Sequence, residues 1–429
     1  MAQDFTQSLA ALERAKKVIP LASQTFSKCY TQLSVGAAPL FLDRGAGSHV
    51  WDVDGNEYID QMLALAPISL GFAYPEVDEA IITQVRRGSI LSLPGKLEAE
   101  LAERICAVVP CAEMVRYGKN GSDMTSAAVR VARAYTGRDV IVCCGYHGWQ
   151  DWYIGTTTRN KGVPPATRAL TKTFTYNDIS SLEQLFRDNE GQIAAVIMEP
   201  IGVEFPRDNF LQKVAEVTRK HGAILIFDEL VTGFRLALGG AQAYFDVTPD
   251  LACFGKAVAN GYPLSVVAGK RELMREFEDI FFSFTFGGDL ISLAAGLATL
   301  TVLEREPVIE HNNKLGHALQ EAFNASAREY GLADRARAIG FGSHHVVQFK
   351  DKEWGDDLAA KTVFQEIMIQ HGVLTIGSNN VCYSHNQEDI NNIIAAYRVA
   401  LAAVKEGLAN DRLEQMIRGR KLEPVFRKP

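Results

Sequence analysis

The stretch AILIFDELVTGFRLALGGAQAYFDVTPDLACFGKAVANGYPLS, residues 223–265, decides the fold. It holds two short apolar runs, 223–227 and 251–254; Asp228 follows the first and Lys256 lies just beyond the second. Apolar runs of this length between turn residues are typical of strands covered on both faces of a parallel sheet. Ligands of such sheets bind beyond the carboxyl ends of the strands, so we expect Asp228 and Lys256 to share one crevice.

The same alternation extends outward in both directions. Further strands are predicted at 140–144 and 194–198, and Glu199 directly follows the second of them. Amphipathic segments between and beyond the strands predict helices at about 97–108, 122–135, 209–221 and 290–306. Strands that alternate with helices of this length indicate an α/β domain with a mainly parallel sheet.

Beyond about residue 304 the pattern changes to an amphipathic helix, an extended piece at 340–350 and a final helix at about 389–406. Near the other end, Asp54-Gly55 between two alternating runs predicts a tight hairpin. We therefore expect three parts: residues 1–60 as an N-terminal segment that packs with the small domain, 61–303 as the large α/β domain, and 304–429 as a small α+β domain.

Composition, net charge and cysteine spacing exclude several classes of protein. The chain has 429 residues, 47% of them hydrophobic and 22% charged, which is typical of soluble globular proteins. A net charge of -7 gives no basic field for nucleic acid. No apolar run approaches the length of a membrane span, and the N-terminus lacks a secretory signal, so we expect a cytoplasmic protein. The 7 cysteines include no C-x-x-C pair, and His344 and His345 lack ligand spacing, so no metal is predicted.

A lysine and a carboxylate in one crevice suit pyridoxal 5'-phosphate. Its aldehyde condenses with a lysine amine, and a carboxylate keeps its ring nitrogen protonated. Gly121 and Ser122 at a predicted helix start offer donors for the phosphate, and Tyr146 offers a stacking face. Each residue alone also has a plain interpretation, as a solvated charge, a turn residue or an ordinary helix start. The set, in this order, is far more specific than its members.

Seven stretches of the sequence resemble the class III, or omega, aminotransferases of fold type I, and within them most closely the glutamate-1-semialdehyde aminomutases. The similarity covers nearly the whole chain. It is carried by WDVDGNEYID, KNGSDMTSAAVRVARAYTGRD, YHGW, MEP, IFDELVTGFR, PDLACFGKAVANGYPLS and FTFGGDLISLAAG. The resemblance implies an aspartate aminotransferase-like fold, with a seven-stranded, mainly parallel sheet in the large domain and a smaller α+β domain.

The resemblance also implies roles for single residues. Lys256 would hold the cofactor as a Schiff base and act as general acid and base, and Asp228 would pair with the pyridine nitrogen. Thr285 would reach the phosphate bound by the other subunit of a homodimer with shared active sites. The remaining cofactor contacts would be Tyr146 and Leu230 on the two ring faces, Gly121 and Ser122 on the phosphate, and Glu199 as a polar neighbour.

Two departures from the aminomutases concern the substrate. Tyr30 stands where their substrate-binding arginine is expected, and 377–380 offers no counterpart of their gating glutamate. A neutral hydroxylated acceptor, such as a keto or aldehyde sugar or a cyclitol, would suit the polar side chains present. The substrate candidates are Tyr30, Asn379, Asn380 and His385, with Trp149 as part of the cleft wall.

The predicted activity is transfer of an amino group from a donor, such as glutamate, to a carbonyl acceptor by a ping-pong mechanism. An intramolecular aminomutase is the alternative. A nonenzymatic cofactor-binding regulator has no supporting feature, and a dinucleotide oxidoreductase lacks its G-x-G-x-x-G turn. His147 remains open between a structural and a catalytic role, and Arg235 between substrate binding and a cap or ion pair.

Overall fold

A computed structural model describes residues 3–353 and 355–424. The chain forms two compact units. We call Pro75–Ile309 the central unit, and the described residues up to Tyr74 together with those from Glu310 onward the terminal unit. The sequence predicted domain changes after residues 60 and 303, and these boundaries stay predictions.

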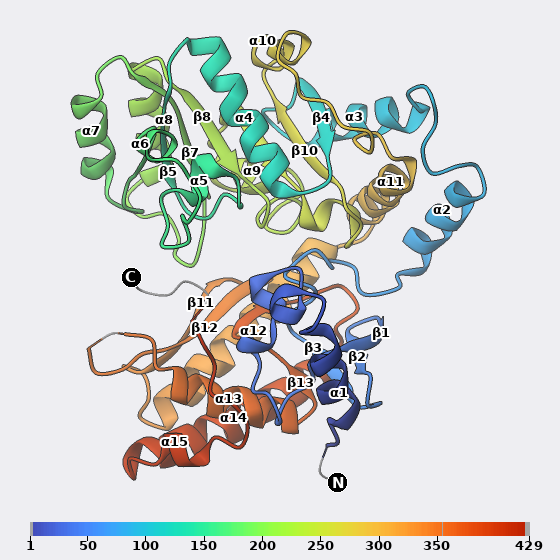
Figure 1. Cartoon of the computed structure of the whole chain (residues 1–429), viewed down its shortest axis with the longest axis vertical. Helices are drawn as coiled ribbons and strands as arrows, with labels where there is room; N and C mark the ends of the chain where they lie inside the picture. Colours follow the sequence, from blue (N-terminus) through green and yellow to red (C-terminus); the bar gives the residue numbers. More distant parts are fainter. Residues whose placement is uncertain (1–2, 354, 425–429) are drawn as a thin grey trace. The chain divides into compact units, whose positions relative to one another are not determined.

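The central unit is built on a seven-stranded sheet in the order β4-β10-β9-β8-β7-β5-β6, as far as the described residues show (Figure 1). Strands β9, β8, β7, β5 and β6 run parallel, and β10 is antiparallel to both of its neighbours. The predicted mainly parallel sheet is therefore confirmed. The strands are β4 (Met114–Gly118), β5 (Val140–Cys144), β6 (Thr171–Thr173), β7 (Ile193–Met198), β8 (Ile224–Asp228), β9 (Leu251–Phe254) and β10 (Ser265–Gly269).

Helices cover this sheet, and α4 shows why they form where they do. The Asn120 side chain accepts a hydrogen bond from the Asp123 backbone at the start of α4, and Gly137 ends it with a φ of 65°. One face of α4 packs on the strands in a shared apolar core. The helices are α2 (Pro75–Val85), α3 (Lys96–Val108), α4 (Gly121–Thr136), α5 (Asp151–Ile154), α6 (Pro165–Ala169), α7 (Ile179–Asp188), α8 (Phe210–Lys220), α9 (Gly240–Phe245), α10 (Arg271–Met274) and α11 (Leu290–Arg305).

The predicted elements of the central unit match these bounds closely. The strands predicted at 140–144 and 251–254 coincide with β5 and β9. The one predicted at 194–198 begins one residue after β7, and the one at 223–227 begins and ends one residue before β8. All residues of β7, β8 and β9 are buried, which explains why their apolar runs are continuous.

The terminal unit contains two smaller sheets, in the orders β1-β2-β3-β13 and β11-β12-β14. The predicted Asp54-Gly55 hairpin joins β2 to β3, while the piece predicted as one extended segment at 340–350 lies largely in the hairpin of β11 and β12. The elements are α1 (Thr6–Ala15), β1 (Leu42–Ala46), β2 (His49–Asp52), β3 (Glu57–Asp60), α12 (Val308–Glu329), β11 (Ala336–Phe341), β12 (His344–Phe349), α13 (Leu358–Gln370), β13 (Val373–Leu374), β14 (Ser378–Asn380), α14 (Gln387–Ala409) and α15 (Leu413–Met416).

The described residues contain neither a candidate membrane span nor a candidate metal cluster. No helix there is long and apolar enough to cross a membrane. Nor does that part of the chain bring three or more His, Cys, Asp or Glu side chains together in a way that could hold a metal ion.

The contact between α12 and the turn after β11 gives a stability prediction. A Cβ on Gly316 would lie 1.8 Å from the carbonyl oxygen of Gly342, so α12 must shift in a Gly316→Ala variant. We expect a loss of about 1–3 kcal/mol of stability, the usual cost of overpacking. It would appear as a lower urea midpoint by circular dichroism. Glu321→Ala, at an exposed position of the same helix, is the control and should change stability by less than about 0.5 kcal/mol. Equal midpoints for the two variants would contradict the prediction.

Candidate active site of the central unit

Three ionisable side chains lie at the carboxyl ends of neighbouring strands, as the sequence predicted. Glu199 follows β7, Asp228 is the last residue of β8, and Lys256 follows β9 after one glycine. Strands β7, β8 and β9 are adjacent and parallel, so their ends meet at one sheet edge. Lys256 has a left-handed backbone with a φ of 45°. For a residue with a Cβ this conformation costs roughly 1–2 kcal/mol, and such strain concentrates at functional sites.

Asp228 is buried and hydrogen-bonded through both carboxylate oxygens. Its Oδ2 lies 2.8 Å from Nδ1 of His147, and its Oδ1 accepts from the Leu230 backbone N–H at 3.2 Å. The other ring nitrogen of His147, Nε2, lies 3.2 Å from the carbonyl oxygen of Cys144. Both ring nitrogens of His147 thus face an oxygen atom. The Asp228 side chain is held in place by His147 through one oxygen and by the Leu230 backbone through the other.

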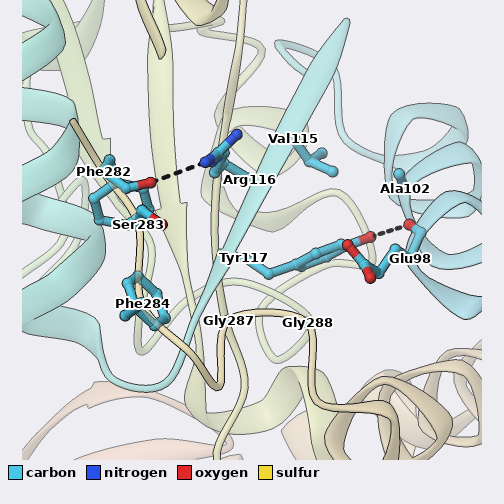
Figure 2. Close-up of a pocket in the computed structure, with 10 residues that line it drawn as sticks. All are labelled: Glu98, Ala102, Val115, Arg116, Tyr117, Phe282, Ser283, Phe284, Gly287 and Gly288. Carbon is cyan, nitrogen blue, oxygen red and sulfur yellow. Dashed lines mark hydrogen bonds between the residues drawn. The ribbon is translucent and has the colours of Figure 1, made fainter. Parts of the chain in front are cut away.

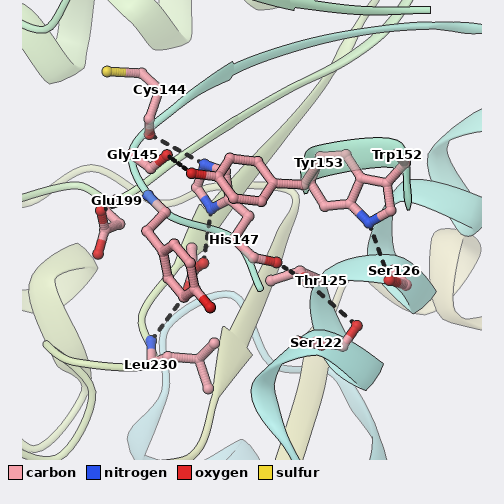
Figure 3. A network of polar contacts seen from close by, with 12 residues as sticks. Ser122, Thr125, Ser126, Cys144, Gly145, His147, Trp152, Tyr153, Glu199 and Leu230 are labelled. Carbon is pink, nitrogen blue, oxygen red and sulfur yellow. Dashed lines mark hydrogen bonds and ion pairs between the residues drawn. The ribbon is translucent and has the colours of Figure 1, made fainter. Parts of the chain in front are cut away.

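Aromatic rings enclose the imidazole of His147 (Figure 3). Trp152 stacks with it at 6.1 Å between ring centroids, and Tyr153 meets it edge-on at 5.2 Å. Each of these rings is itself fixed by a hydrogen bond, from Trp152 Nε1 to Ser126 Oγ at 3.0 Å and from the Tyr153 hydroxyl to the Gly145 carbonyl at 2.9 Å. The orientation of His147 is thus determined by packing on two sides.

Glu199 and Lys256 have ionisation shifted by burial. Loss of solvent raises the pKa of the Glu199 carboxyl, and the nearby charge of Asp228 raises it further. Burial lowers the pKa of the Lys256 amine, and the charges of Asp228 and Glu199 partly oppose this. Oε2 of Glu199 accepts from the Tyr146 backbone N–H at 2.9 Å. The site therefore favours a lysine amine that is neutral more often than an exposed one, which nucleophilic attack on an aldehyde requires.

The start of α4 lies against the same region through close glycine contacts. A Cβ on Gly121 would lie 2.3 Å from a methyl of Leu230, and one on Gly255 would lie 2.6 Å from its other methyl. Oγ of Ser122 accepts from the Trp149 backbone N–H at 3.2 Å. Leu230 is thereby wedged between the start of α4 and the residue before Lys256.

Of the other predicted site residues of the central unit, Tyr146, Trp149 and Thr285 lie at the surface and Arg235 is buried. Tyr146 is 53% exposed and meets Tyr153 edge-on at 5.6 Å, which leaves a ring face available for stacking. Trp149 is 65% exposed, and Thr285 is exposed in the loop before α11. Arg235 is 2% exposed, and its positive charge contributes to the lowered pKa of the Lys256 amine.

The remaining substrate candidates belong to the terminal unit, where most of their polar atoms are already bonded. Asn379 is buried, and its side chain pairs with Thr375 Oγ1 at 2.6 Å and with the Tyr397 hydroxyl at 3.2 Å. His385 is also buried, with Nδ1 accepting from the Cys382 backbone at 3.1 Å. Nothing in these two placements supports contact with a substrate.

Asn380 is bonded in the same way. It is buried, with Oδ1 2.8 Å from Nδ1 of His344 and Nδ2 donating to the Met62 carbonyl at 3.0 Å. Tyr30 is only half-buried, and its ring lies 5.0 Å from Nζ of Lys16.

The residues present fit pyridoxal phosphate. A half-buried lysine and a buried aspartate lie at the carboxyl ends of adjacent strands, as the aldehyde and the ring nitrogen require. Gly121 leaves the helix start of α4 without a side chain, where a phosphate would meet backbone N–H groups. This donor set is that of a fold type I pyridoxal-phosphate enzyme.

Solved structures support this class. FumI of Sphingopyxis sp. MTA144, in its pyridoxal-phosphate internal aldimine form, superposes with a TM-score of 0.88 at 29% identity, over 94% of this chain and 98% of that one. An omega-transaminase from Sphaerobacter thermophilus superposes with a TM-score of 0.84 at 26% identity, over 92% and 97% of the two chains.

The sequence comparisons give the family. The chain belongs to the class-III aminotransferases, whose family model matches residues 30–387. It is 35% identical to 3-aminobutyryl-CoA aminotransferase of Cloacimonas acidaminovorans over 94% of this chain and 99% of that protein. It is 40% identical to glutamate-1-semialdehyde 2,1-aminomutase of Methanothrix thermoacetophila over 75% and 77% of the two chains. The protein is thus a pyridoxal-phosphate-dependent transaminase, and the predicted fold, family, enzyme class and cofactor are confirmed.

The sequence leaves the roles of His147 and Arg235 undecided and does not single out Tyr153. His147 had no assigned role, and the structure shows it bonded to Asp228. Tyr153, which packs against His147 and Tyr146, was not singled out. Its nearness in sequence to the YHGW stretch was the available signal, but proximity does not reveal which side chains turn toward the sheet.

The lowered pKa of Lys256 can be measured in the cofactor-free protein. With the lysines dimethylated by ¹³C-formaldehyde, the NMR resonance that is missing from Lys256→Met should titrate below 10.5, because burial disfavours the ammonium form. Glu199→Gln should lower that pKa further, since Glu199 is a negative neighbour of the amine. A Lys256 resonance that titrates at or above 10.5 would contradict the prediction.

Proposed function

We propose that the protein transfers an amino group from an amino acid donor, such as glutamate, to a neutral carbonyl acceptor in two half-reactions. The observation that carries the proposal is the pairing of a half-buried lysine with a His147-bonded Asp228 at the ends of adjacent strands. Pyridoxal phosphate, when bound, supplies an aldehyde for the amine and a protonated ring that accepts charge from the substrate carbon.

In this proposal the side chains of the central unit hold the cofactor. Lys256 bonds to it, Asp228 keeps the ring nitrogen protonated, and Tyr146 and Leu230 cover the two ring faces. Gly121 and Ser122 bind the phosphate. His147 acts on the cofactor through Asp228, because its Nδ1 is hydrogen-bonded to the carboxylate while its Nε2 is anchored on the Cys144 carbonyl.

Two groups would handle protons during the reaction. Once the donor amine has replaced it, the Lys256 amine is free to carry a proton from the substrate carbon to the cofactor, and its lowered pKa suits this role of general base. Glu199 is a polar neighbour, and burial followed by the charge of Asp228 raises the pKa of its carboxyl. We assign it to the polar edge of the cofactor, beside the backbone of Tyr146.

The proposal of a neutral, hydroxylated acceptor, such as a keto or aldehyde sugar or a cyclitol, rests on missing charge. Tyr30 stands where the aminomutases are expected to carry their substrate-binding arginine, so a bidentate carboxylate clamp is absent there. Because Asn379 and His385 are committed to the interior of the terminal unit, Tyr30 and Trp149 are the candidates that remain accessible. The aminomutase remains the second candidate, favoured by the identity to relatives of that name.

The cofactor's spectrum tests the reaction type. The protein loaded with pyridoxal phosphate should absorb at roughly 410 to 430 nm, lose that band with a competent amino donor, and regain it with a neutral carbonyl acceptor. Glutamate 1-semialdehyde without a donor should allow a single half-reaction only. The control, Lys256→Ala, should lack the lysine-bound band. Continuous turnover of glutamate 1-semialdehyde without a donor would establish the aminomutase instead, and absence of the band from the wild type would refute the role of Lys256.

We also propose that the enzyme is a homodimer in which Thr285 reaches the phosphate of the partner's site. The support is the exposure of the loop that carries Thr285. Its Phe281 and Phe286 side chains are 82% and 62% exposed. Exposed apolar side chains that lie close together mark surfaces that another protein covers.

Subunit complementation tests the shared site. A heterodimer of Lys256→Ala with Thr285→Ala has one site with both residues intact if Thr285 acts on the partner's site, and none if it acts on its own. We expect the heterodimer to bind pyridoxal phosphate with near wild-type affinity at one site. The Thr285→Ala homodimer should bind it about tenfold more weakly, as for loss of one hydrogen bond to a charged group. A heterodimer with only the weak affinity would show that Thr285 does not act on the partner's site.

A further inference from the structure

The loop that carries Thr285 is held to the central unit mainly by its backbone and its last residue. It runs from Phe281 to Asp289, and we call it the Thr285 loop. Of its side chains, Phe282 packs best, with its ring 5.4 Å from that of Phe277 at the edge of the core. Thr285 itself is exposed. Side-chain burial therefore contributes little to the conformation of this loop.

Three cations tie the loop at its two ends. Arg130 Nη1 donates to the carbonyl oxygen of Phe281 at 3.0 Å, and Arg116 Nη2 donates to that of Phe282 at 2.9 Å. At the other end, Lys119 Nζ forms an ion pair with Asp289 Oδ2 at 2.5 Å. Hydrogen bonds with a charged donor are roughly twice as strong as neutral ones. The ends of the loop are thus fixed while its middle is not.

Behind the middle of the loop lies a cavity of about 330 Å³ (Figure 2). Its walls come from α3 and β4 on one side and from the loop on the other. Figure 2 shows Arg116 reaching from β4 to Phe282 at the cavity's edge. The space behind the loop is not filled by apolar side chains. The position of the loop therefore depends on its bonds to Arg116, Arg130 and Lys119, which we call the tethers.

All three cations belong to one continuous segment. Arg116 lies on β4, Arg130 on α4, and Lys119 in the turn between them. The same turn leads into Gly121 and Ser122, the proposed phosphate contacts of the subunit's own site. The segment from β4 to α4 therefore touches the cofactor region of one site and holds the loop proposed to serve the other.

We propose that Arg116, Arg130 and Lys119 are positioning residues that set the Thr285 loop for the active site of the partner subunit. The inference rests on the proposed shared dimer and adds to it the groups that act through Thr285. Loss of the tethers lowers the affinity of the partner's site for pyridoxal phosphate and leaves the subunit's own site unchanged.

Heterodimers with one silent site test this directly. Lys256→Ala removes the lysine-bound visible band from one site, so the band reports only the site that keeps Lys256. With Arg116→Ala and Arg130→Ala on the Lys256→Ala subunit, the reporting site receives its Thr285 from the altered loop. We expect its dissociation constant for pyridoxal phosphate to rise about tenfold. With both arginine changes on the Lys256-bearing subunit, we expect no change.

A second readout needs no cofactor. In the cofactor-free protein, backbone amides of residues 281–289 should exchange with deuterium faster in the double arginine variant than in wild type, because the loop has lost its tethers. Arg219→Ala is the matched control, since Arg219 donates to the Thr248 carbonyl at 3.1 Å elsewhere in the central unit. Arg116→Gln and Arg130→Gln, tested singly, keep the measurement available if the double variant misfolds.

The outcomes separate this inference from the proposed function. Thr285→Ala in the same silent subunit should weaken the reporting site. If it does and the arginine changes do not, the positioning role is wrong and the shared site stands. If neither acts on the partner's site, the shared site itself fails. An effect of the arginine changes confined to their own subunit would overturn the inference in favour of a local structural role.

Discussion

The hydrogen bond between Asp228 and His147 is the constraint on which the active site depends. A carboxylate taken out of water is stable only if its oxygens keep partners, and here the imidazole and a backbone N–H supply them. The imidazole in turn needs two acceptors and a rigid enclosure, which the Cys144 carbonyl and the rings around it provide. The Asp228 carboxylate is therefore the centre of one packed arrangement. It joins the end of β8 to the turn after β5 and to the rings of Trp152 and Tyr153.

This charge also accounts for the balance between the lysine and the acids. Burial lowers the pKa of the Lys256 amine and raises that of the Glu199 carboxyl, and the charge of Asp228 raises both pKa values. The protonation of Lys256 and of Glu199 thus depends on the charges around them. A proton that moves between atoms of such a site leaves its total charge unchanged, as two successive half-reactions on different substrates require.

Much of this could be predicted from sequence, for physical reasons that also explain the failures. Strands buried on both faces are continuous apolar runs, so the sequence predicts the exact bounds of β5 and β9. Ligands bind beyond the carboxyl ends of such strands, which is where Asp228 and Lys256 lie in the sequence. Contacts across long separations have no such local signal, and the bond between His147 and Asp228 spans 81 positions. Polarity likewise does not reveal burial. Asn379, chosen as a substrate contact for its amide, uses that amide inside its own unit.

The wedge formed by Leu230 has a consequence for how this enzyme can change. Its two methyls fill spaces left by Gly121, at the start of α4, and by Gly255, directly after β9. A larger residue in place of Gly121 or Gly255 requires a smaller side chain at position 230. A smaller side chain at position 230 alone leaves a gap beside the two glycines. The side chains at these three positions therefore constrain one another. A side chain added at one glycine alone must displace a methyl of Leu230, whereas a paired change at Leu230 makes room for it.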